Sequence, residues 1–332
     1  MATASLRRDL RLAGEGLETA EGRLRYFSHH AKTFRFAARL FPKDQLQKVA
    51  DVYAFCRFTD DLVDEASDEY EQTTESRLDV WLSLARKAYD GGDSGIPFLD
   101  AVMSETRNSG VPFSYAGDLI SGMRMDLAGT RYRTLDDLRL YSYRVASVVG
   151  GWLTELFGVR DPWVLEGAFA LGHAMQLTNI LRDVGEDLAD DRLYLPLDRM
   201  DRHGIDVEFL NAKRENGSPI FPGYKELLEN LMADADADYE RAFESIPALP
   251  RFFQGPVAVA ASVYRGIHDE IRKNDYDNLT RRASTSLPRK VLLAWKGLRP
   301  LREVGARQAL ETAEGTVPLR TFRNQAEGRA AS

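Results

Sequence analysis

The chain has 332 residues, of which 44% are hydrophobic and 29% are charged, and its formal net charge is −7. The acidic balance argues against nucleic acid as a partner, and the one cysteine, Cys56, excludes a disulfide framework and favours a reducing, cytoplasmic compartment. The longest apolar runs, at 145–153 and 255–263, are shorter than the roughly 18 to 20 residues that cross a bilayer, so we expect a globular protein without a transmembrane helix or a secretory signal.

Helices are the only regular elements that the sequence predicts. Apolar residues recur every three or four positions between widely spaced Gly and Pro, and no segment has the alternation typical of a strand. The predicted fold class is therefore all-α, with residues 192–221 as a loop between two helical halves. The predicted helices cover residues 17–40, 44–66, 72–89, 96–108, 113–127, 135–157, 162–189, 223–245, 250–272 and 287–302.

The helix over 162–189 has a good start signal, because Asp161 is a favoured N-cap residue and Pro162 fits the first helical turn. Its length of roughly 40 Å suits a large helical bundle. We expect one domain with a short segment on each side. The extension covers 1–23, the domain covers 24–304, and a flexible tail covers 305–332.

Two of the predicted helices each carry a polar stripe on one face. In the first, offsets 0, 4, 7 and 11 hold Tyr53, Arg57, Asp60 and Asp64, with Asp61 beside them. In the second, offsets 0, 3, 7 and 11 hold Gln176, Asn179, Asp183 and Asp187. A lone carboxylate run is usually a solvated surface face, and that interpretation stays open. Two matched stripes that continue from inward-facing positions favour a shared ligand instead.

Carboxylates that face one another need a counter-charge, because two like charges about 4 Å apart cost on the order of 4 kcal/mol at an effective dielectric of about 20. Carboxylate and amide oxygens are ligands that Mg²⁺ prefers, with Mn²⁺ as a substitute, and neither stripe has the His or Cys typical of zinc or copper sites. Mg²⁺ usually shares its coordination shell with substrate phosphates. The sequence therefore predicts a magnesium-dependent site for a diphosphate.

Basic side chains near the stripes are candidates to hold diphosphate oxygens, which arginine binds bidentately. They are Lys32, Arg35, Arg57, Arg144 and Arg182. A structural role stays an alternative for each of them, and Arg182 in particular directly precedes Asp183 and could be its intrahelical partner. His29 and His30 could equally be ordinary buried or surface histidines.

Five motifs resemble those of the squalene/phytoene synthase family, and of its phytoene synthase branch in particular: YAFCRFTDDLVDE, GMRMDLAGTRY, YSYRVASVVG, QLTNILRDVGEDLADDRLYLP and YRGIHDEIRKNDYDN. The resemblance covers residues 24–300 and implies an isoprenoid synthase fold, a single helical bundle with both acidic motifs facing a central cavity. One departure is Ala31, where many relatives carry serine. Ala31 cannot donate a hydroxyl to the diphosphate, whereas Thr33 can.

Carried over residue by residue, the resemblance implies roles for the stripes and their neighbours. The implied metal ligands are Asp60, Asp64, Asn179, Asp183 and Asp187. The implied catalytic residues are the four aspartates of that set together with Tyr53. The implied diphosphate-binding residues are His30, Lys32, Thr33, Arg57, Arg144, Gln176, Asn179, Arg182, Tyr194 and Tyr264. Tyr53 and Tyr264 are also expected to flank the reacting centre.

The implied activity is a prenyltransferase reaction, the head-to-head condensation of two geranylgeranyl diphosphates. It passes through a cyclopropyl diphosphate to phytoene, the first committed step of carotenoid biosynthesis, and NADPH is not expected for it. Carbocation chemistry needs a closed apolar channel. The rings of Tyr53, Phe34 and Phe55 are candidates to face the cation, with a plain core role as the alternative for each.

Two other functions stay open. A squalene-branch enzyme would use farnesyl diphosphate to make presqualene diphosphate, hydroxysqualene, squalene or dehydrosqualene. The small residues Ala37, Ala38 and Ala50, on helices expected to wall the cavity, favour the longer C20 substrate, although helix packing would also explain them. A non-catalytic relative, either a helical assembly protein or a lipid-binding protein, would be marked by a broken acidic motif, and both motifs are intact here.

Greasy substrates and products lead us to expect peripheral contact with the inner membrane face. Residues 5–12, SLRRDLRL, are a candidate for a weak amphipathic anchor, with a solvated extra helix as the alternative. No obligate protein partner is predicted.

Overall fold

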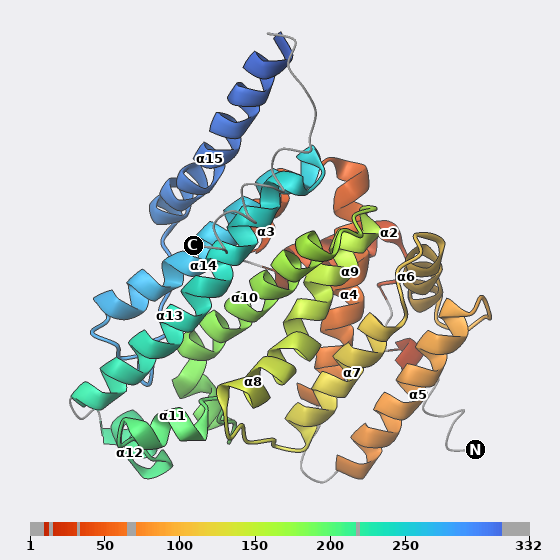
Figure 1. Ribbon diagram of the computed structural model, residues 1–332. Helices are drawn as coiled ribbons and strands as arrows, with labels where there is room; N and C mark the ends of the chain where they lie inside the picture. Colours follow the sequence, from red (N-terminus) through yellow and green to blue (C-terminus); the bar gives the residue numbers. More distant parts are fainter. Residues whose placement is uncertain (1–9, 13–15, 32–33, 65–70, 217–219, 314–332) are drawn as a thin grey trace.

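The computed structural model describes residues 10–12, 16–31, 34–64, 71–216 and 220–313, and Figure 1 shows their helices packed as one bundle. No strand occurs in this part of the chain, so the predicted all-α class is confirmed. None of the helices described is both long enough and apolar enough to cross a membrane. The α-helices are α2 Ala20–His30, α3 Phe34–Ala38, α4 Lys43–Asp64, α5 Glu71–Tyr89, α6 Pro97–Asn108, α7 Ser114–Leu127, α8 Leu135–Ser142, α9 Val148–Leu156, α10 Pro162–Ala189, α11 Leu197–Arg202, α12 Val207–Asn216, α13 Pro222–Ser245, α14 Arg251–Lys273 and α15 Leu287–Ala313.

Helix α10 is the central element of the bundle. Its span agrees with the prediction, and the Asp161 carboxylate caps it by accepting from the backbone N–H of Trp163 at 2.9 Å. α10 contacts α8, α9, α13 and α14. In Figure 1, α10, α13 and α14 run side by side in one half of the molecule, α4, α7 and α9 lie in the other half, and α15 lies at the outer edge against α14.

The predicted helix over 17–40 is divided into α2 and α3. Ala31 ends α2 by leaving the helical conformation, with ψ 52°, while its N–H still closes the last turn on the carbonyl of Phe27. The prediction of one continuous helix was therefore wrong. Helix α15 also continues to Ala313, past the domain boundary expected at residue 304.

The segment 192–221, predicted to be a loop, contains the short helices α11 and α12. Met200 and Leu210 are buried in the core beside α10 and α13, so this connection is anchored by its own apolar side chains. The Gly and Pro residues of this segment led to the prediction of a loop. Burial of its apolar side chains instead accompanies two short helices.

The predicted helix over 135–157 is interrupted by a π turn at Tyr143–Ser147, between α8 and α9. Two glycines allow the neighbouring helices to approach this turn. A Cβ on Gly122 of α7 would lie 2.6 Å from a side-chain atom of the turn, and a Cβ on Gly172 of α10 would lie 2.4 Å from its backbone. The π turn is therefore held between α7 and α10 by tertiary packing.

A tryptophan-centred core fixes α4, which carries the first acidic stripe. Phe55 stacks on Trp81 with 5.6 Å between ring centroids and lies 5.5 Å from Trp152, and all three side chains are fully buried. Trp81 donates its N–H to the Thr59 hydroxyl at 2.9 Å. Phe55 is therefore a core residue, as its alternative interpretation held, while the side chain of Phe34 lies outside the described part of the structure.

Candidate active site

A largely apolar cavity of about 310 Å³ lies between α4, the π turn with α9, α10 and α14. Its polar lining residues include four of the predicted site residues: Tyr53 from α4, Gln176 and Asn179 from α10, and Tyr264 from α14. The rest of the lining is mainly aliphatic and aromatic. Because Tyr53 begins the first polar stripe and Gln176 begins the second, both stripes start at this one cavity.

The first stripe forms a paired cluster. Arg57 contacts Asp60 at 2.8 Å and Asp61 at 2.6 Å, both within α4. Tyr26 of α2 donates its hydroxyl to Asp61 at 2.6 Å. Burial and this bond to Asp61 raise the pKa of Tyr26. Tyr26 was not among the predicted site residues, and no feature of the sequence around it signalled a role.

Several predicted residues around the first stripe fall outside the cavity or outside the description. Lys32, Thr33 and the side chain of Asp64 belong to the undescribed part of the chain. His30 is described: its ring lies 4.4 Å from that of Tyr26, and burial, followed by the charge of Arg57, lowers its pKa. His30 lines a separate surface pocket with Tyr26, next to the first stripe but not in the apolar cavity.

The second stripe has Asp183 held by two arginines. Arg182 donates from Nε to Asp183 at 2.7 Å, which is the structural partnership that the sequence left open. Arg282, which follows α14 in the chain, donates from Nε at 2.9 Å and from Nη2 at 3.2 Å to the same carboxylate. Arg282 was missed because it lies 99 residues away in the sequence, beyond the last recognisable motif.

The segment that carries Arg282 is fixed on α10 by Asn278, which is 3% exposed. The Asn278 side-chain amide donates to the carbonyl of Leu181, and the backbone carbonyl of Asn278 accepts from the N–H of Gly185 at 3.1 Å. A Cβ on Gly185 would lie 2.1 Å from the carbonyl oxygen of Leu279, so only glycine permits this approach. Gly185, between the two aspartates of the motif, therefore allows Arg282 to reach Asp183.

Asp187 and Asn179 are two residues of the second stripe whose side-chain oxygens lie in unfavourable surroundings. Burial, followed by the charge of Asp183, raises the pKa of Asp187 to about 7. The side-chain oxygen of Asn179 is buried and has no hydrogen-bond partner. Both features are expected of a cation site. A bound cation would favour the ionised form of the carboxylate and would give the buried carbonyl oxygen a partner.

Tyr194 supports an acidic residue rather than lining the cavity. Its hydroxyl donates to Asp126 at 2.8 Å, and Tyr141, whose ring stacks on it at 5.2 Å, donates to the same carboxylate at 3.0 Å. Asp126 in turn contributes to the raised pKa of Asp187. Asp126 lies in GMRMDLAGTRY, so the motif was noticed but no role was assigned to its carboxylate.

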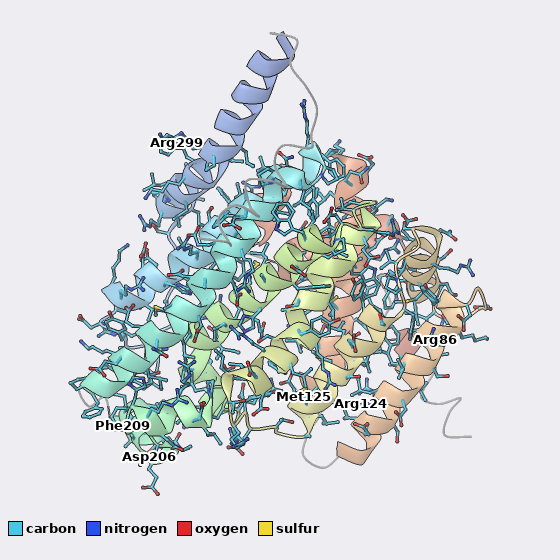
Figure 2. The ribbon with its side chains drawn as sticks, in the orientation of Figure 1. Arg86, Arg124, Met125, Asp206, Phe209 and Arg299 are labelled. Atoms are coloured by element: carbon cyan, nitrogen blue, oxygen red, sulfur yellow. The ribbon has the colours of Figure 1, made fainter. Side chains whose placement is uncertain are left out.

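Arg144 lies on the π turn and is not part of the cavity lining, although its neighbours Val145 and Ala146 are. It donates to the sulfur of Met125 at 3.3 Å, near the carboxyl end of α7 (Figure 2). The structure therefore places this predicted diphosphate ligand against α7 and outside the cavity lining.

Tyr53 and Tyr264 connect the two stripes electrostatically. Burial raises the pKa of Tyr53 to about 12, with further influences from Arg57 and Tyr264. Burial also raises the pKa of Tyr264, and the charges of Arg182 and Asp183 in the second stripe act on it as well. Both phenols thus stay protonated near neutral pH and act as neutral dipoles.

The residues present fit a hard cation, even though arginines hold several of the carboxylates. Among the described side chains, no three of the His, Cys, Asp and Glu type lie together as a ready-made metal cluster. The unpartnered oxygen of Asn179 and the carboxylates of Asp183 and Asp187 nevertheless form a set of oxygen donors of the kind that Mg²⁺ or Mn²⁺ takes.

The small residues expected to set cavity depth do not line it. Ala37 packs between α3, α14 and α15, and Ala38 and Ala50 are buried in the main core. None of the three is in the cavity lining. Helix packing, the alternative explanation, accounts for them, so they carry no information about substrate length.

The model of the squalene/phytoene synthase family matches residues 27–289. The chain belongs to this family. It is 36% identical over 271 residues to phytoene synthase 3 of Zea mays, covering 79% of this chain and 61% of the maize protein. It is also 36% identical to the phytoene synthases of Cereibacter sphaeroides and Thermus thermophilus, covering 75% and 89% of those proteins. The five motifs that carried the resemblance all lie within the residues that the family model matches.

Solved structures of a dehydrosqualene synthase and a squalene synthase confirm the isoprenoid synthase fold. A dehydrosqualene synthase complex superposes with a TM-score of 0.75 at 28% identity, covering 91% of this chain and all of the other. A squalene synthase from Alicyclobacillus acidocaldarius gives 0.69 at 24% identity, covering 83% of this chain and 99% of the other. Family membership also confirms the predicted class of enzyme, a prenyltransferase most similar to phytoene synthases.

Proposed function

We propose that this protein condenses two molecules of geranylgeranyl diphosphate head to head, through a cyclopropyl diphosphate, to phytoene, the first committed step of carotenoid biosynthesis. The observation that carries the proposal is the convergence of the two acidic stripes on one apolar cavity, with the Asn179 oxygen buried there without a partner. The matched relatives named phytoene synthase, at 36% identity, support the C20 substrate.

Five residues of the stripes would hold Mg²⁺, or Mn²⁺ in its place: Asp60, Asp64, Asn179, Asp183 and Asp187. The bound cation would supply Lewis-acid stabilisation of the leaving diphosphate. No role for NADPH is proposed.

The arginines of the two stripes would bind the diphosphates directly. Arg57, Arg182 and Arg282 hold carboxylates in the structure, and a diphosphate offers them oxygens of the same geometry and higher charge. A change of partner would free Asp60 and Asp183 to bind the cation. Arginine is suited to such an exchange because it stays charged in both arrangements.

The cavity lining would protect the carbocations that follow ionisation. Its apolar side chains exclude water, which would otherwise quench the cation. The rings of Tyr53 and Tyr264 line the same space and offer their faces to positive charge. Because both phenols keep their protons near neutral pH, they would act through their rings and dipoles and not as bases.

A squalene-branch reaction on farnesyl diphosphate is the second candidate. The observation that favours it is the superposition on a dehydrosqualene synthase, with a TM-score of 0.75 and 28% identity. It would need the same cation site and the same arginines, so only the length of the prenyl chain and the product separate the two candidates.

Product analysis distinguishes them. Purified protein is incubated with Mg²⁺ and either geranylgeranyl or farnesyl diphosphate, with and without NADPH, and the extracted hydrocarbon is identified by mass. We expect a C40 product from geranylgeranyl diphosphate that does not depend on NADPH. A C30 product alone would replace the phytoene proposal with the squalene-branch one.

A further inference from the structure

Helix α15 has apolar side chains on the side that faces away from the bundle as well as on its packed side. The packed side reaches α14 through Leu293, in a cluster that includes Ala37 of α3. The outer side exposes Leu287 (65%), Val291 (55%), Leu292 (42%) and Trp295 (53%). Single exposed apolar residues are common on protein surfaces. At about 100° per residue, however, these four lie on one side of the helix and form a stripe.

The same part of the chain is basic, although the protein as a whole has a net charge of −7. Between Asn278 and Leu301 the sequence has no Asp or Glu. Six basic residues lie in this stretch: Arg281, Arg282, Arg289, Lys290, Lys296 and Arg299. Figure 2 shows Arg299 on the outer side of α15.

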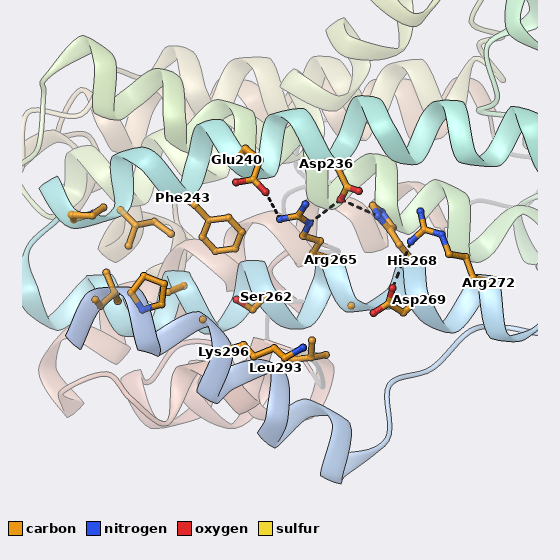
Figure 3. Close-up of a pocket in the computed structure, with 17 residues that line it drawn as sticks. Asp236, Glu240, Phe243, Ser262, Arg265, His268, Asp269, Arg272, Leu293 and Lys296 are labelled. Carbon is orange, nitrogen blue, oxygen red and sulfur yellow. Dashed lines mark hydrogen bonds and ion pairs between the residues drawn. The ribbon is translucent and has the colours of Figure 1, made fainter. Parts of the chain in front are cut away.

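The acidic residues close to α15 are already paired inside the bundle. A groove of about 560 Å³ between α13, α14 and α15 is lined by Asp236, Glu240 and Asp269 (Figure 3). Arg265 lies 2.9 Å from Asp236 and 2.6 Å from Glu240, and Arg289 lies 2.5 Å from Asp269. Each of these three carboxylates is therefore already bound by an arginine, so none of them is left to pair with the other basic residues of α15.

We propose that the outer face of α15, defined by Leu287, Val291, Leu292 and Trp295, is a docking surface for an anionic lipid bilayer. An apolar stripe that contains Trp and is flanked by Lys and Arg is the pattern of a helix lying in a membrane interface. Anionic headgroups complement the basic stretch. A second copy of this chain would instead bring two basic stretches together, which charge repulsion disfavours.

Of the predicted amino-terminal anchor at residues 5–12, the structure describes residues 10–12, and Leu12 is 50% exposed. Leu10, in the stretch predicted to be a weak anchor, is 0% exposed and belongs to the main core. Behind α15, by contrast, Met175 and Ala260 belong both to the cluster around Leu293 and to the lining of the apolar cavity. Docking through α15 therefore places the cavity one helical layer from the lipid. If the proposed function holds, prenyl chains enter and leave the cavity on that side. This last step is the only one that rests on the proposed function.

Vesicle flotation with the full-length protein tests the proposal. The vesicles are phosphatidylcholine with or without phosphatidylglycerol, and the variant is Val291→Ser/Trp295→Ser. Trp163→Ser is the matched control, because Trp163 is 41% exposed at the start of α10, away from α15. We expect the wild type to bind the anionic vesicles, with binding weakened by added salt. The double variant should bind roughly ten-fold or more weakly, and the control should bind as the wild type does.

The experiment measures vesicle binding and does not require turnover. Its result therefore tests the docking surface independently of the proposed reaction. Failure of the wild type to bind anionic vesicles would overturn the proposal, as would equal binding by the double variant. A dimer that dissociates when the stripe is changed would identify a second copy as the occupant and would also overturn it. Circular dichroism checks folding, and Leu292→Ser serves as the test variant if the double variant does not fold.

Discussion

Asp187 is a candidate site carboxylate whose ionisation is opposed by its surroundings in the fold. Burial, followed by the neighbouring charge of Asp183, raises its pKa from 3.8 to about 7. A carboxyl group with a folded pKa above its unfolded value contributes stability that is fully present below about pH 4 and is lost as the pH rises through about 7. Above that pH, the cation-free protein therefore carries an ionised, poorly compensated Asp187.

We predict that Asp187→Asn stabilises the cation-free protein at about pH 8, by on the order of 2 kcal/mol, and has a smaller effect at about pH 5. The same substitution should remove most of the stabilisation that Mg²⁺ gives the wild type at the higher pH, and most of the turnover. Thermal unfolding with EDTA or Mg²⁺ at both pH values measures this. A variant less stable than the wild type at about pH 8 in EDTA would contradict the assignment.

Arg282 should contribute to substrate affinity through its bidentate geometry. Losing one charge-assisted interaction costs about 1.5 to 3 kcal/mol, so Arg282→Gln should raise the KM for the prenyl diphosphate roughly ten-fold or more. The neighbouring, exposed Arg281 is the matched control, and Arg281→Gln should leave KM within about two-fold of the wild type. Steady-state kinetics with both variants measure the difference. Equal KM values for the two would remove Arg282 from the diphosphate site.

Helical periodicity could group only those candidate site residues that share one helix. The spacing of Gln176, Asn179 and Asp183 is a local property of α10, and helical periodicity is enough to place them on one face. Arg282 and Tyr26 come from other elements and approach their aspartates only in the folded chain. A single sequence contains no periodic signal for such contacts.

At the level of elements, α10 was predictable because its signals are local. Asp161 caps it, and its apolar residues keep the helical period to Ala189. The π turn at Tyr143–Ser147 was not predictable in this way, because its two close neighbours are glycines on other helices. Periodicity indicates that a segment is helical but not that its turns are widened by packing.

The packing of the π turn gives a direct test with a matched control. Gly172→Ala would place a Cβ 2.4 Å from the backbone of the turn, which must then shift, so we expect destabilisation of about 1 to 3 kcal/mol and reduced turnover. Gly117→Ala, inside α7, would meet only a ring atom at 3.9 Å, so it should stabilise the protein by about 0.5 to 1 kcal/mol. Chemical denaturation measures both. Equal effects of the two substitutions would show that the turn tolerates displacement.

At the scale of the whole molecule, the all-α class and the site of the cavity followed from the sequence and the resemblance, whereas the dimensions of the cavity did not. Cavity volume depends on side chains from α4, α10, α14 and the π turn together. Ala37, Ala38 and Ala50 were chosen for their size and helix, and tertiary packing buries them elsewhere. The size of a residue does not indicate substrate length unless the residue is known to line the cavity.

Ala168 lines the cavity and offers a test of chain length. Ala168→Leu adds apolar volume inside the cavity, so we expect turnover of geranylgeranyl diphosphate to fall several-fold more than turnover of farnesyl diphosphate. The two substrates serve as controls for each other in the same preparation, and thermal unfolding checks that the variant is folded. An equal loss with both would show that the prenyl chain does not pass Ala168.

The most direct test of the central claim is a crystal structure with Mn²⁺ and a non-ionisable thio analogue of the prenyl diphosphate. The claim is that both acidic stripes hold the cations and diphosphate at the entrance of the apolar cavity. We predict metal density between Asp60 of α4 and Asn179, Asp183 and Asp187 of α10, with the prenyl chain between Tyr53 and Tyr264. Density for the analogue elsewhere, with Asp60 and Asp183 still bound to their arginines, would contradict it.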